Sequence, residues 1–510
     1  MTPERRDRGG RTGLAVAWIA ATMPFVPAVL AFVSHGVPDV LFTGDGAVLE
    51  LGTFRAAHGV QLVGPYSRFG WSHPGPAYFY LAAPFYEAFH EHGPALNVFA
   101  LSVDYAAALG VVLLAYRLCG LAFSLLMAAL VGVYVLVGAP YLLANEWNPI
   151  VPILPLACAA VTAACISRGD AGLWPVFAFV ASAIVQTHVG FAPSAVVLAI
   201  FAAVGHSGQR SGRTGRAVWI TTAVVLTVCW LLPLIEVAVH PPGNLVAIAR
   251  FFVPKHWAEH SWGEAVRIVV QQMAVVPNAV LQTARARPVT AQRLAGIMLG
   301  LQIAALAFVA ASGEDAAARS LARLALVELG VAVVAVRAIR GEIEFYLVAW
   351  ISVIGVTSFA ALAAAVLSVV ERWAGWTITF IVATAAAVTF MAAALTSPVA
   401  RSSVVPLRDE ADDTLARQVS QYVESAALDQ PVIRVEGMKT WPAAAGTLLF
   451  LTKRGIAVSA GGDLLRIVGD AFTPSPGPHA ELIFDATDAP VPTGAVPIAK
   501  AGQVAVYRRG

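Results

Sequence analysis

Apolar runs of membrane-spanning length recur along the first 396 residues of this 510-residue chain. Because an α-helix satisfies its own backbone hydrogen bonds, a run of about twenty apolar residues is expected to cross a bilayer as a helix. With 58% of its residues hydrophobic and only 13% charged, the chain also lies outside the range of ordinary soluble domains. The sequence therefore predicts an all-α polytopic membrane protein with about eleven transmembrane helices, at 14–33, 95–118, 120–143, 150–167, 171–187, 190–205, 217–238, 293–312, 321–338, 345–370 and 375–396.

Arginines in the short loops predict the orientation of these helices, because cytoplasmic loops retain positive charge. The segments that fall on one side under this helix count carry Arg5, Arg6, Arg8 and Arg11, the basic loop 206–216, and Arg168, Arg319, Arg323 and Arg372. We therefore expect a plasma-membrane protein with a cytoplasmic N-terminus. The run 14–33 lacks a small-residue cleavage site, so we expect a retained helix rather than a removed signal peptide.

The external side is then predicted to receive the long loops 34–94 and 239–292, the turn 337–346 and the segment after residue 396. That segment has the composition of a soluble domain. Helical patterns and short apolar strands alternate in it, with helices expected at 409–426 and 441–455 and strands at 431–437, 481–486 and 503–509. We expect a transmembrane domain at 1–396 and a small external α/β domain at 397–510.

Charge, cysteine and motif patterns argue against several classes of function. A formal net charge of +2 gives no bulk attraction to nucleic acid. The four cysteines lie in or beside apolar runs without CxxC or Cys/His spacing, which disfavours a disulfide framework and a zinc site. The chain has no P-loop and no GxGxxG motif after a strand, so nothing indicates a nucleotide donor.

The first external loop holds the densest group of candidate functional residues. Asp45 stands at the N-cap position of a helix that we expect to run to His58, where Gly59 ends it. Glu50 lies five residues on and faces a different side of this helix. Aromatic residues and prolines in the segment 66–86 predict a second helix in the membrane interface. Ordinary charges on a solvated interfacial helix are the alternative interpretation of each acid.

The order of these segments resembles the GT-C superfamily of integral-membrane glycosyltransferases, which take sugar from a polyprenyl-phosphate carrier. The shared pattern is one span, a large external loop with an acid near its start (TGDGAVLE), a proline-marked amphipathic segment (HPGPAYFYLAAPFYEAFH) and the next span. The later segments NEWNPIVPILP, QTHVGFAP and WLLPLIEVAVHPPGNL fit the same pattern. The resemblance covers roughly residues 13–396. Gly46 follows Asp45 where protein mannosyltransferases and arabinan polymerases have a second acidic residue.

The resemblance implies a glycosyltransferase, hexosyl or pentosyl and inverting, that moves a sugar from polyprenyl phosphate to an envelope glycan, lipid or protein on the external face. Such transfer needs a carboxylate that accepts the proton of the attacking hydroxyl. Asp45 is the predicted general base. Glu50 is the second catalytic candidate, as a group that orients the acceptor or holds a cation. No cofactor is certain, and a divalent cation is left open.

Basic residues near the membrane plane are the candidates for binding the donor phosphate, because cations pair with lipid phosphates. They are Arg68, Lys255, His256, Arg337 and Arg340, of which one or two are expected to contact the ligand. His73 and Glu236 are expected to line the same cavity. His188 is interpreted as a hydrogen-bonded histidine at a helix end. Salt bridges and interfacial anchoring are the alternative roles for these residues.

Two other classes of function share this hydropathy. A transporter or flippase for a lipid-linked saccharide often has internally repeated halves, and no such repeat is evident here. A non-catalytic envelope membrane protein would leave Asp45 without a special role. The long, acid-bearing first loop favours the transferase.

Overall fold

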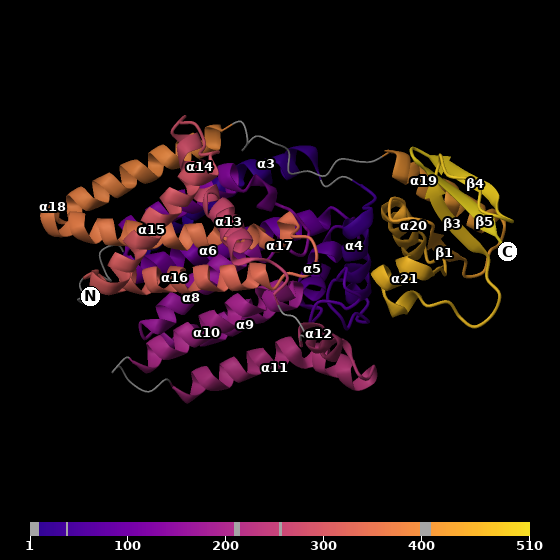
Figure 1. Cartoon of the computed structure of the whole chain (residues 1–510), viewed down its shortest axis with the longest axis horizontal. Coiled ribbons are helices and arrows are strands. Elements are labelled where there is room, and N and C mark those ends of the chain that lie inside the picture. The colour runs from indigo at the N-terminus through magenta and orange to yellow at the C-terminus, as the bar shows by residue number, and fades with distance from the viewer. Residues whose placement is uncertain (1–9, 37–38, 209–214, 254–257, 398–409) are drawn as a thin grey trace.

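Long helices running side by side form most of the molecule in this computed structural model, which describes residues 10–36, 39–208, 215–253, 258–397 and 410–510. They follow its long axis, and a small α/β unit lies beyond one end of them (Figure 1). The first half of the helical region contains α2 (Gly10–Thr22), α3 (Val26–His35), α4 (Gly44–Ala57), α5 (Ala77–Ala88), α6 (Ala95–Cys119), α7 (Leu121–Val133), α8 (Ile153–Ser167), α9 (Trp174–Thr187) and α10 (Ala192–Ser207).

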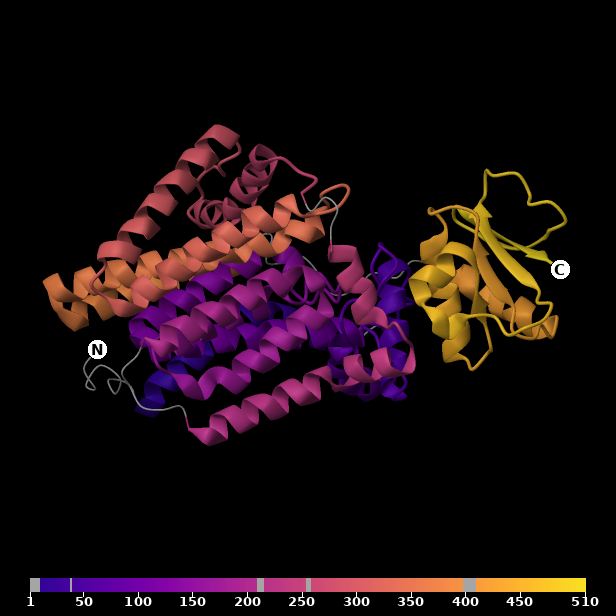
Figure 2. The same cartoon turned by 60° about the horizontal axis from the view of Figure 1, so that its bottom comes forward.

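The second half of the helical region contains long spanning helices and short connecting ones. They are α11 (Arg216–Val239), α12 (Asn244–Phe252), α13 (Trp262–Met273), α14 (Val275–Thr283), α15 (Gln292–Ser312), α16 (Ala316–Arg337), α17 (Phe345–Val348) and α18 (Ser352–Thr396). α18 bends back on itself at Gly375, whose φ of +78° interrupts the helix. Its two arms meet at the end of the molecule that lies far from the α/β unit (Figure 2).

The described residues contain seven helical stretches that are long and apolar enough to cross a membrane: Gly10–Ser34, Ala95–Cys119, Leu121–Gly138, Val189–Ser207, Arg216–Val239, Gln292–Ser312 and Phe345–Thr396. Two shorter apolar helices, Ile153–Ser167 and Ala171–Thr187, accompany them. The last of the seven includes the turn at Gly375 and so covers two of the predicted runs. The remaining run lies in α16, which also carries charged residues. The predicted multi-pass helical membrane architecture is confirmed.

Short contacts gather the arginine-bearing ends of several helices at one end of the bundle. Ser167, at the end of α8, shares a hydrogen bond of 2.8 Å with Ser320 at the start of α16. Arg117, at the end of α6, pairs with Asp170 at 2.8 Å. Figure 1 places the facing ends of α10 and α11 at this same end, opposite the α/β unit. The compartment that this end faces stays a prediction.

The C-terminal unit is a five-stranded mixed sheet in the order β2-β1-β3-β5-β4, with helices packed against it. Its elements are α19 (Glu410–Ser425), β1 (Val432–Val435), α20 (Trp441–Lys453), β2 (Ser459–Ala460), α21 (Gly462–Val468), β3 (Glu481–Ala486), β4 (Val496–Ala501) and β5 (Val504–Arg509). β1 pairs in parallel with β2 and β3, and β5 pairs antiparallel with β3 and β4. The two expected helices and three expected strands are present, which confirms the α/β character of this unit.

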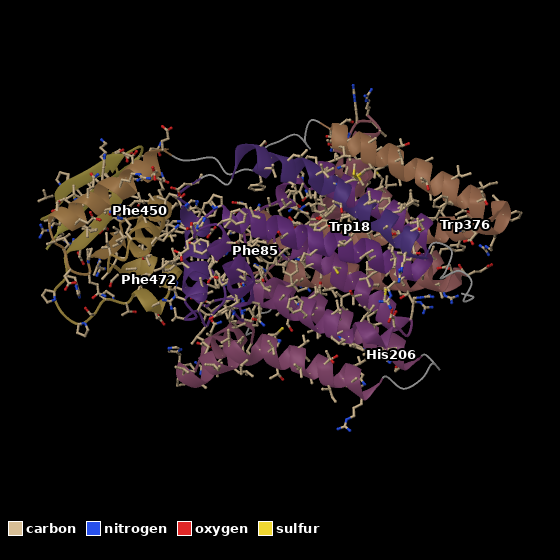
Figure 3. The ribbon with its side chains drawn as sticks, turned by 180° about the vertical axis from the view of Figure 1, so that it is seen from behind. Trp18, Phe85, His206, Trp376, Phe450 and Phe472 are labelled. Carbon is tan, nitrogen blue, oxygen red and sulfur yellow. The ribbon has the colours of Figure 1, made fainter. Side chains whose placement is uncertain are left out.

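One continuous hydrophobic core joins the α/β unit to the helical region. α4 packs against α5 on one side and against α20 on the other. Leu49 of α4 and Phe79 of α5 belong to the same buried cluster as Leu448 and Leu449 of α20. Figure 3 shows Phe85 and Phe450 on the two sides of this junction. The junction holds α4 between the two parts of the molecule.

Candidate active site

A cavity of about 850 Å³ lies where α4 meets the helical region. Segments far apart in the sequence form its walls: the start of α4, the loop 66–73, residues 147–149, residues 188–197, the end of α12 and residues 330–350. One part of the lining is polar and aromatic, and another part is almost wholly apolar. Four of the residues predicted from the sequence lie in it, namely Asp45, Arg68, His73 and Arg340.

Asp45 provides the carboxylate of the polar part. The Tyr66 hydroxyl donates a hydrogen bond of 2.6 Å to Asp45 Oδ1. Burial raises the pKa of Asp45, while hydrogen bonds from Tyr66 and Trp147 act in the opposite direction. A carboxylate with a raised pKa is a stronger proton acceptor than a free aspartate, which suits a general base.

Asp45 does not occupy the N-cap position that the sequence predicted. The N-cap of α4 is Thr43, and Asp45 lies inside the first turn, so its carboxylate is directed to Tyr66 instead of capping the helix. Gly44 begins the helix with a φ of +55°, a conformation that residues with a side chain rarely adopt. The other end follows the prediction, because α4 ends at Ala57 and Gly59 has a φ of +73°.

The α/β unit contacts the start of α4 directly. A Cβ atom at Gly44 would lie 3.4 Å from Pro442 and 3.7 Å from Trp441, so both residues of α20 lie directly beside this turn. The Trp441 ring also meets the Tyr66 ring edge-on, at 6.3 Å between centroids. The C-terminal unit therefore helps to fix the two residues that form the hydrogen bond at the carboxylate.

Arg68 and Arg340 provide positive charge along the cavity. Arg68 donates a hydrogen bond of 3.0 Å to the carbonyl oxygen of Glu342, and it lies 3.9 Å from the Glu344 carboxylate. The Arg340 guanidinium stacks over the Phe251 ring at 4.3 Å. Cation–π stacking leaves the edge of a guanidinium available to hydrogen-bond acceptors. Both arginines can therefore approach an anion in the cavity.

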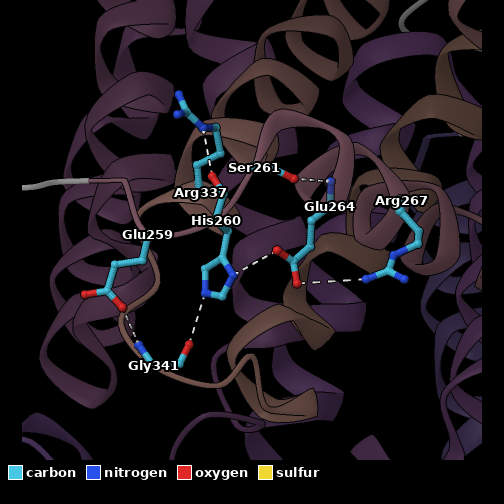
Figure 4. Close-up of polar contacts among 7 residues, drawn as sticks. All are labelled: Glu259, His260, Ser261, Glu264, Arg267, Arg337 and Gly341. Atoms are coloured by element: carbon cyan, nitrogen blue, oxygen red, sulfur yellow. Dashed lines mark hydrogen bonds and ion pairs between the residues drawn. The ribbon is translucent and has the colours of Figure 1, made fainter.

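Arg337 has a different environment. Its Nε donates to the carbonyl oxygen of His260 at 3.2 Å, and its guanidinium lies 3.9 Å over the Trp262 ring. Figure 4 shows this residue within a network that ties the segment 259–267 to Gly341. His260 joins the network through Glu264 at 3.1 Å and the Gly341 carbonyl at 3.0 Å. Arg337 thus holds the turn that carries Arg340, and it is not among the residues that line the cavity.

Glu236, like Arg337, lies behind the residues that line the cavity and contacts them only indirectly. Both of its carboxylate oxygens accept from the backbone N–H of Asn244, at 3.1 and 2.9 Å. The Asn244 side chain in turn accepts from the N–H of Ser72 at 2.9 Å and donates to the carbonyl of His73 at 3.2 Å. Glu236 is therefore connected to the loop that bears His73, although it does not itself line the cavity.

Glu50 lies on the side of α4 that faces the α/β unit. Its Oε1 accepts from Lys453 Nζ at 2.6 Å and from the Tyr86 hydroxyl at 2.8 Å, and the residue is 1% exposed. It is not among the lining residues of the cavity. The catalytic role expected for Glu50 stays a prediction, and the observed contacts give its carboxylate a place in the junction between the helical region and the α/β unit.

Lys255 and His256 also belong to the site that the sequence predicts, which leaves a divalent cation open. Lys255 and His256 lie outside the described residues. Among the residues that the structure describes, no group of three His, Cys, Asp or Glu side chains is arranged to hold a metal ion. The divalent cation that the sequence left open therefore has no matching donor set among these residues.

Several lining residues were not identified as site residues from the sequence. Tyr66 and Trp147 bond Asp45, and Tyr346 packs on Trp147 with 4.9 Å between ring centroids. His188 also lines the cavity, besides being the helix-end histidine that was expected. The available signal was local: Trp147 and His188 stand in NEWNPIVP and QTHVGFAP, where polar and aromatic residues interrupt the apolar runs.

The apolar part of the lining comes mainly from α10 and α16. Val196 and Val197 face the cavity from α10, and Val331 and Val334 face it from α16. Val196 is 58% exposed and Val334 is 44% exposed, so the cavity reaches the outer surface of these two apolar helices. That surface is the one a bilayer would cover.

The arrangement of the whole chain is similar to that of ArnT from Cupriavidus metallidurans, whose crystal structure in the apo state gives a TM-score of 0.54 at 15% sequence identity and covers 98% of each chain. The crystal structure of the Archaeoglobus fulgidus oligosaccharyltransferase in complex with Zn and sulfate gives a TM-score of 0.44 at 13% identity, covering 85% of this chain and 61% of that one. No protein-family profile and no curated protein matches the sequence. A membrane-spanning helical region, a C-terminal sheet unit and this full-length likeness to ArnT together identify the fold of the chain as the GT-C fold.

Proposed function

We propose that the chain is a membrane glycosyltransferase that moves a sugar from a polyprenyl-phosphate donor to a hydroxyl of an envelope glycan, lipid or protein on the external face. The observation that carries the proposal is the combination, in one cavity, of a buried carboxylate, two guanidinium groups and an apolar wall. A lipid-linked sugar phosphate offers the matching order of groups: an apolar chain, an anion and a polar sugar. The GT-C fold supports the same assignment.

The apolar wall between α10 and α16 supports a lipid-linked donor over a soluble one. Val196 and Val334 are about half exposed at this wall, so an apolar chain could pass between the cavity and the bilayer without crossing water. Exposing each methylene group of such a chain to water would cost about 0.8 kcal/mol, a cost that this route avoids. A soluble nucleotide sugar would gain nothing from this surface.

Arg68 and Arg340 are the proposed partners of the donor phosphate. Guanidinium groups bind phosphate oxygens in a bidentate manner and keep their charge at any working pH. Among the described members of the predicted basic set, these two line the cavity, whereas Arg337 supports the turn that carries Arg340. We therefore assign charge stabilisation of the leaving group to Arg68 and Arg340.

The proposed reaction is a single displacement with Asp45 as the base. The acceptor hydroxyl gives its proton to Asp45 as its oxygen attacks the anomeric carbon. The bond between that carbon and the phosphate oxygen breaks, and its electron pair leaves with polyprenyl phosphate. Attack opposite the leaving group inverts the anomeric configuration. Asp45 then loses the proton to water, which restores the carboxylate.

A transfer assay on the full chain in lipid nanodiscs tests the proposal. A panel of polyprenyl-phosphate sugars would be offered with hydroxyl-bearing envelope extracts, and both labelled acceptor and released polyprenyl phosphate would be measured. Equal amounts of the two products from one donor would support the assignment. Movement of intact donor between leaflets of proteoliposomes, without release of polyprenyl phosphate from any donor in the panel, would indicate a flippase instead.

The pH dependence of transfer is expected to report the ionisation of Asp45 and the effect of the hydrogen bond that Tyr66 donates to it. Only ionised Asp45 accepts a proton, so activity should rise with pH through its pKa, which burial places above the ordinary aspartate value of about 3.9. Tyr66→Phe removes a hydrogen bond that favours the ionised form. The acid limb of the kcat/KM profile should therefore move to higher pH in this variant.

Tyr116→Phe provides the matched control, since Tyr116 lies beside Gly13 near the opposite end of the bundle. Its profile should coincide with that of the unchanged protein. An acid limb at the same pH in Tyr66→Phe and in the unchanged protein would contradict the role given to this hydrogen bond.

The orientation in the membrane is a separate prediction. Reporter fusions in the loop 206–216 and after Gly510 should report opposite compartments, because the helix ends at that loop and the α/β unit lie at opposite ends of the bundle (Figure 1). The basic loop should report the cytoplasm. Finding the C-terminal fusion in the cytoplasm would place the cavity, Asp45 included, on the wrong side for an external acceptor.

A further inference from the structure

We propose that His73 and His188 form a pair of neutral hydrogen-bond donors that binds an anionic oxygen of the donor phosphate. The inference rests on the proposed function for the identity of the ligand, and on the geometry of the two rings for the rest. Both histidines line the cavity, and they are 4% and 8% exposed. Their ring centroids lie 4.4 Å apart.

Backbone hydrogen bonds fix the tautomer of both rings. The N–H of Val189 donates to His73 Nδ1 at 3.1 Å, and the N–H of Gly190 donates to His188 Nδ1 at 3.2 Å. A ring nitrogen that accepts a hydrogen bond carries no proton, so each neutral imidazole carries its proton on Nε2. Within the described residues neither Nε2 has a hydrogen-bond partner, and the cavity is the space that remains for both groups.

The same hydrogen bonds favour an anion as the partner. Val189 and Gly190 form the first turn that leads into α10, where free backbone N–H groups give the helix its positive end. Donation from this turn into Nδ1 polarises each ring and strengthens its Nε2–H as a donor, since hydrogen bonds in a chain reinforce one another. The two imidazoles thereby extend the positive potential at the start of α10 into the cavity.

Both imidazole rings are expected to bind the anion in their neutral form. Burial lowers the pKa of His73, and the neighbouring His188 lowers it further. Burial also lowers the pKa of His188, to about 4. The occupied Nδ1 atoms disfavour an alternative role as metal ligands, because a ligating histidine usually donates its second ring N–H to a neighbouring group. Here that second nitrogen accepts instead.

Gly190 is the residue that makes this geometry accessible. A Cβ atom at position 190 would lie 2.9 Å from both Nδ1 and Cε1 of His188, closer than ordinary contacts allow. Gly190→Ala is therefore expected to displace the His188 ring and to weaken anion binding in the same direction as loss of the ring itself.

Two matched substitutions at each histidine test the inference. Gln places its amide nitrogen near the position of Nε2 and preserves the donor, whereas Asn reaches only the position of Nδ1 and removes it. Binding of polyprenyl phosphate to the full chain in nanodiscs should weaken about ten- to a hundred-fold in His73→Asn or His188→Asn, the range for loss of a hydrogen bond to a charged group. The Gln variants should stay within about three-fold of the unchanged protein, well below that range. His479→Asn, in the exposed part of the α/β unit, is the control.

Spectra of ¹⁵N-histidine-labelled protein give a readout that does not need catalysis. Signals that are lost in each Gln variant assign the spectrum to His73 and His188. We expect an unprotonated Nδ1 and a protonated Nε2 for both residues. Polyprenyl phosphate and, at higher concentration, inorganic phosphate should shift the Nε2 signals, whereas a neutral sugar should not. Protonated Nδ1 atoms, Asn variants that bind as well as Gln variants, or a response to the neutral sugar alone would overturn the inference. Correct tautomers and phosphate binding without any sugar transfer would sink the proposed function and leave the anion site intact.

Discussion

Asp45→Asn is expected to lower the rate of sugar transfer by about a hundred- to ten-thousand-fold, the range that a positioned general base contributes. The amide oxygen can still accept the hydrogen bond that Tyr66 donates to Asp45 Oδ1 in the unchanged protein, so the cavity should keep its shape. The amide cannot take the proton of the acceptor hydroxyl. The transfer assay in nanodiscs measures the loss, and binding of polyprenyl phosphate should be little changed.

Asp463→Asn is the matched control, because Asp463 is paired with Arg466 on the exposed surface of the α/β unit. Its turnover should equal that of the unchanged protein. If Asp45→Asn protein that inserts and melts normally retains near-normal turnover, Asp45 is only a structural carboxylate and the base lies elsewhere.

Lys453→Met is expected to cause the largest loss of stability among substitutions at the junction between the helical region and the α/β unit. Lys453 Nζ lies 2.6 Å from both Glu50 Oε1 and the carbonyl oxygen of Glu91, and Glu50 is 1% exposed. Removing one partner of a buried ion pair leaves the other charge unpaired, which costs about 3 to 5 kcal/mol. Because the Lys453 side chain is 25% exposed, the lower end of that range is expected. Thermal unfolding in detergent should show the loss.

The double variant Lys453→Met/Glu50→Gln distinguishes an unpaired charge from lost packing. With both charges removed, stability should recover most of the loss, since neither partner remains buried without the other. Lys500→Met, on the exposed strand β4, should have little effect. A double variant no more stable than Lys453→Met would show that the ion pair does not account for the loss.

The fold was largely predictable from the sequence, because apolar runs of fixed length have few alternatives in a bilayer. The eleven runs coincide with helices, and Gly375 separates the last two as the boundary between 345–370 and 375–396 indicated. Strands β2 and β4 were not predicted. β2 has only two residues, and β4 contains Pro497 at a shift in its pairing with β5. Neither gives the alternating pattern on which strand prediction depends.

The site was predictable only in part, since the sequence shows what residues lie in a loop but not what they face across the fold. Asp45, Arg68, His73 and Arg340 were singled out and do line one cavity. The position of Glu50 on the opposite side of α4 depends on Lys453, more than four hundred residues away in the chain. No local pattern in the first loop could reveal that partner.

Because the cavity opens between α10 and α16, the relevant concentration of a donor that enters there is its concentration in the membrane. Such a molecule arrives by diffusion in two dimensions, so its mole fraction in the membrane, rather than its amount per volume of water, sets how often the site is filled. Under the proposed function, released polyprenyl phosphate would leave by the same route and would compete with fresh donor at the same opening. The composition of the surrounding leaflet would then directly set the rate of the proposed transfer.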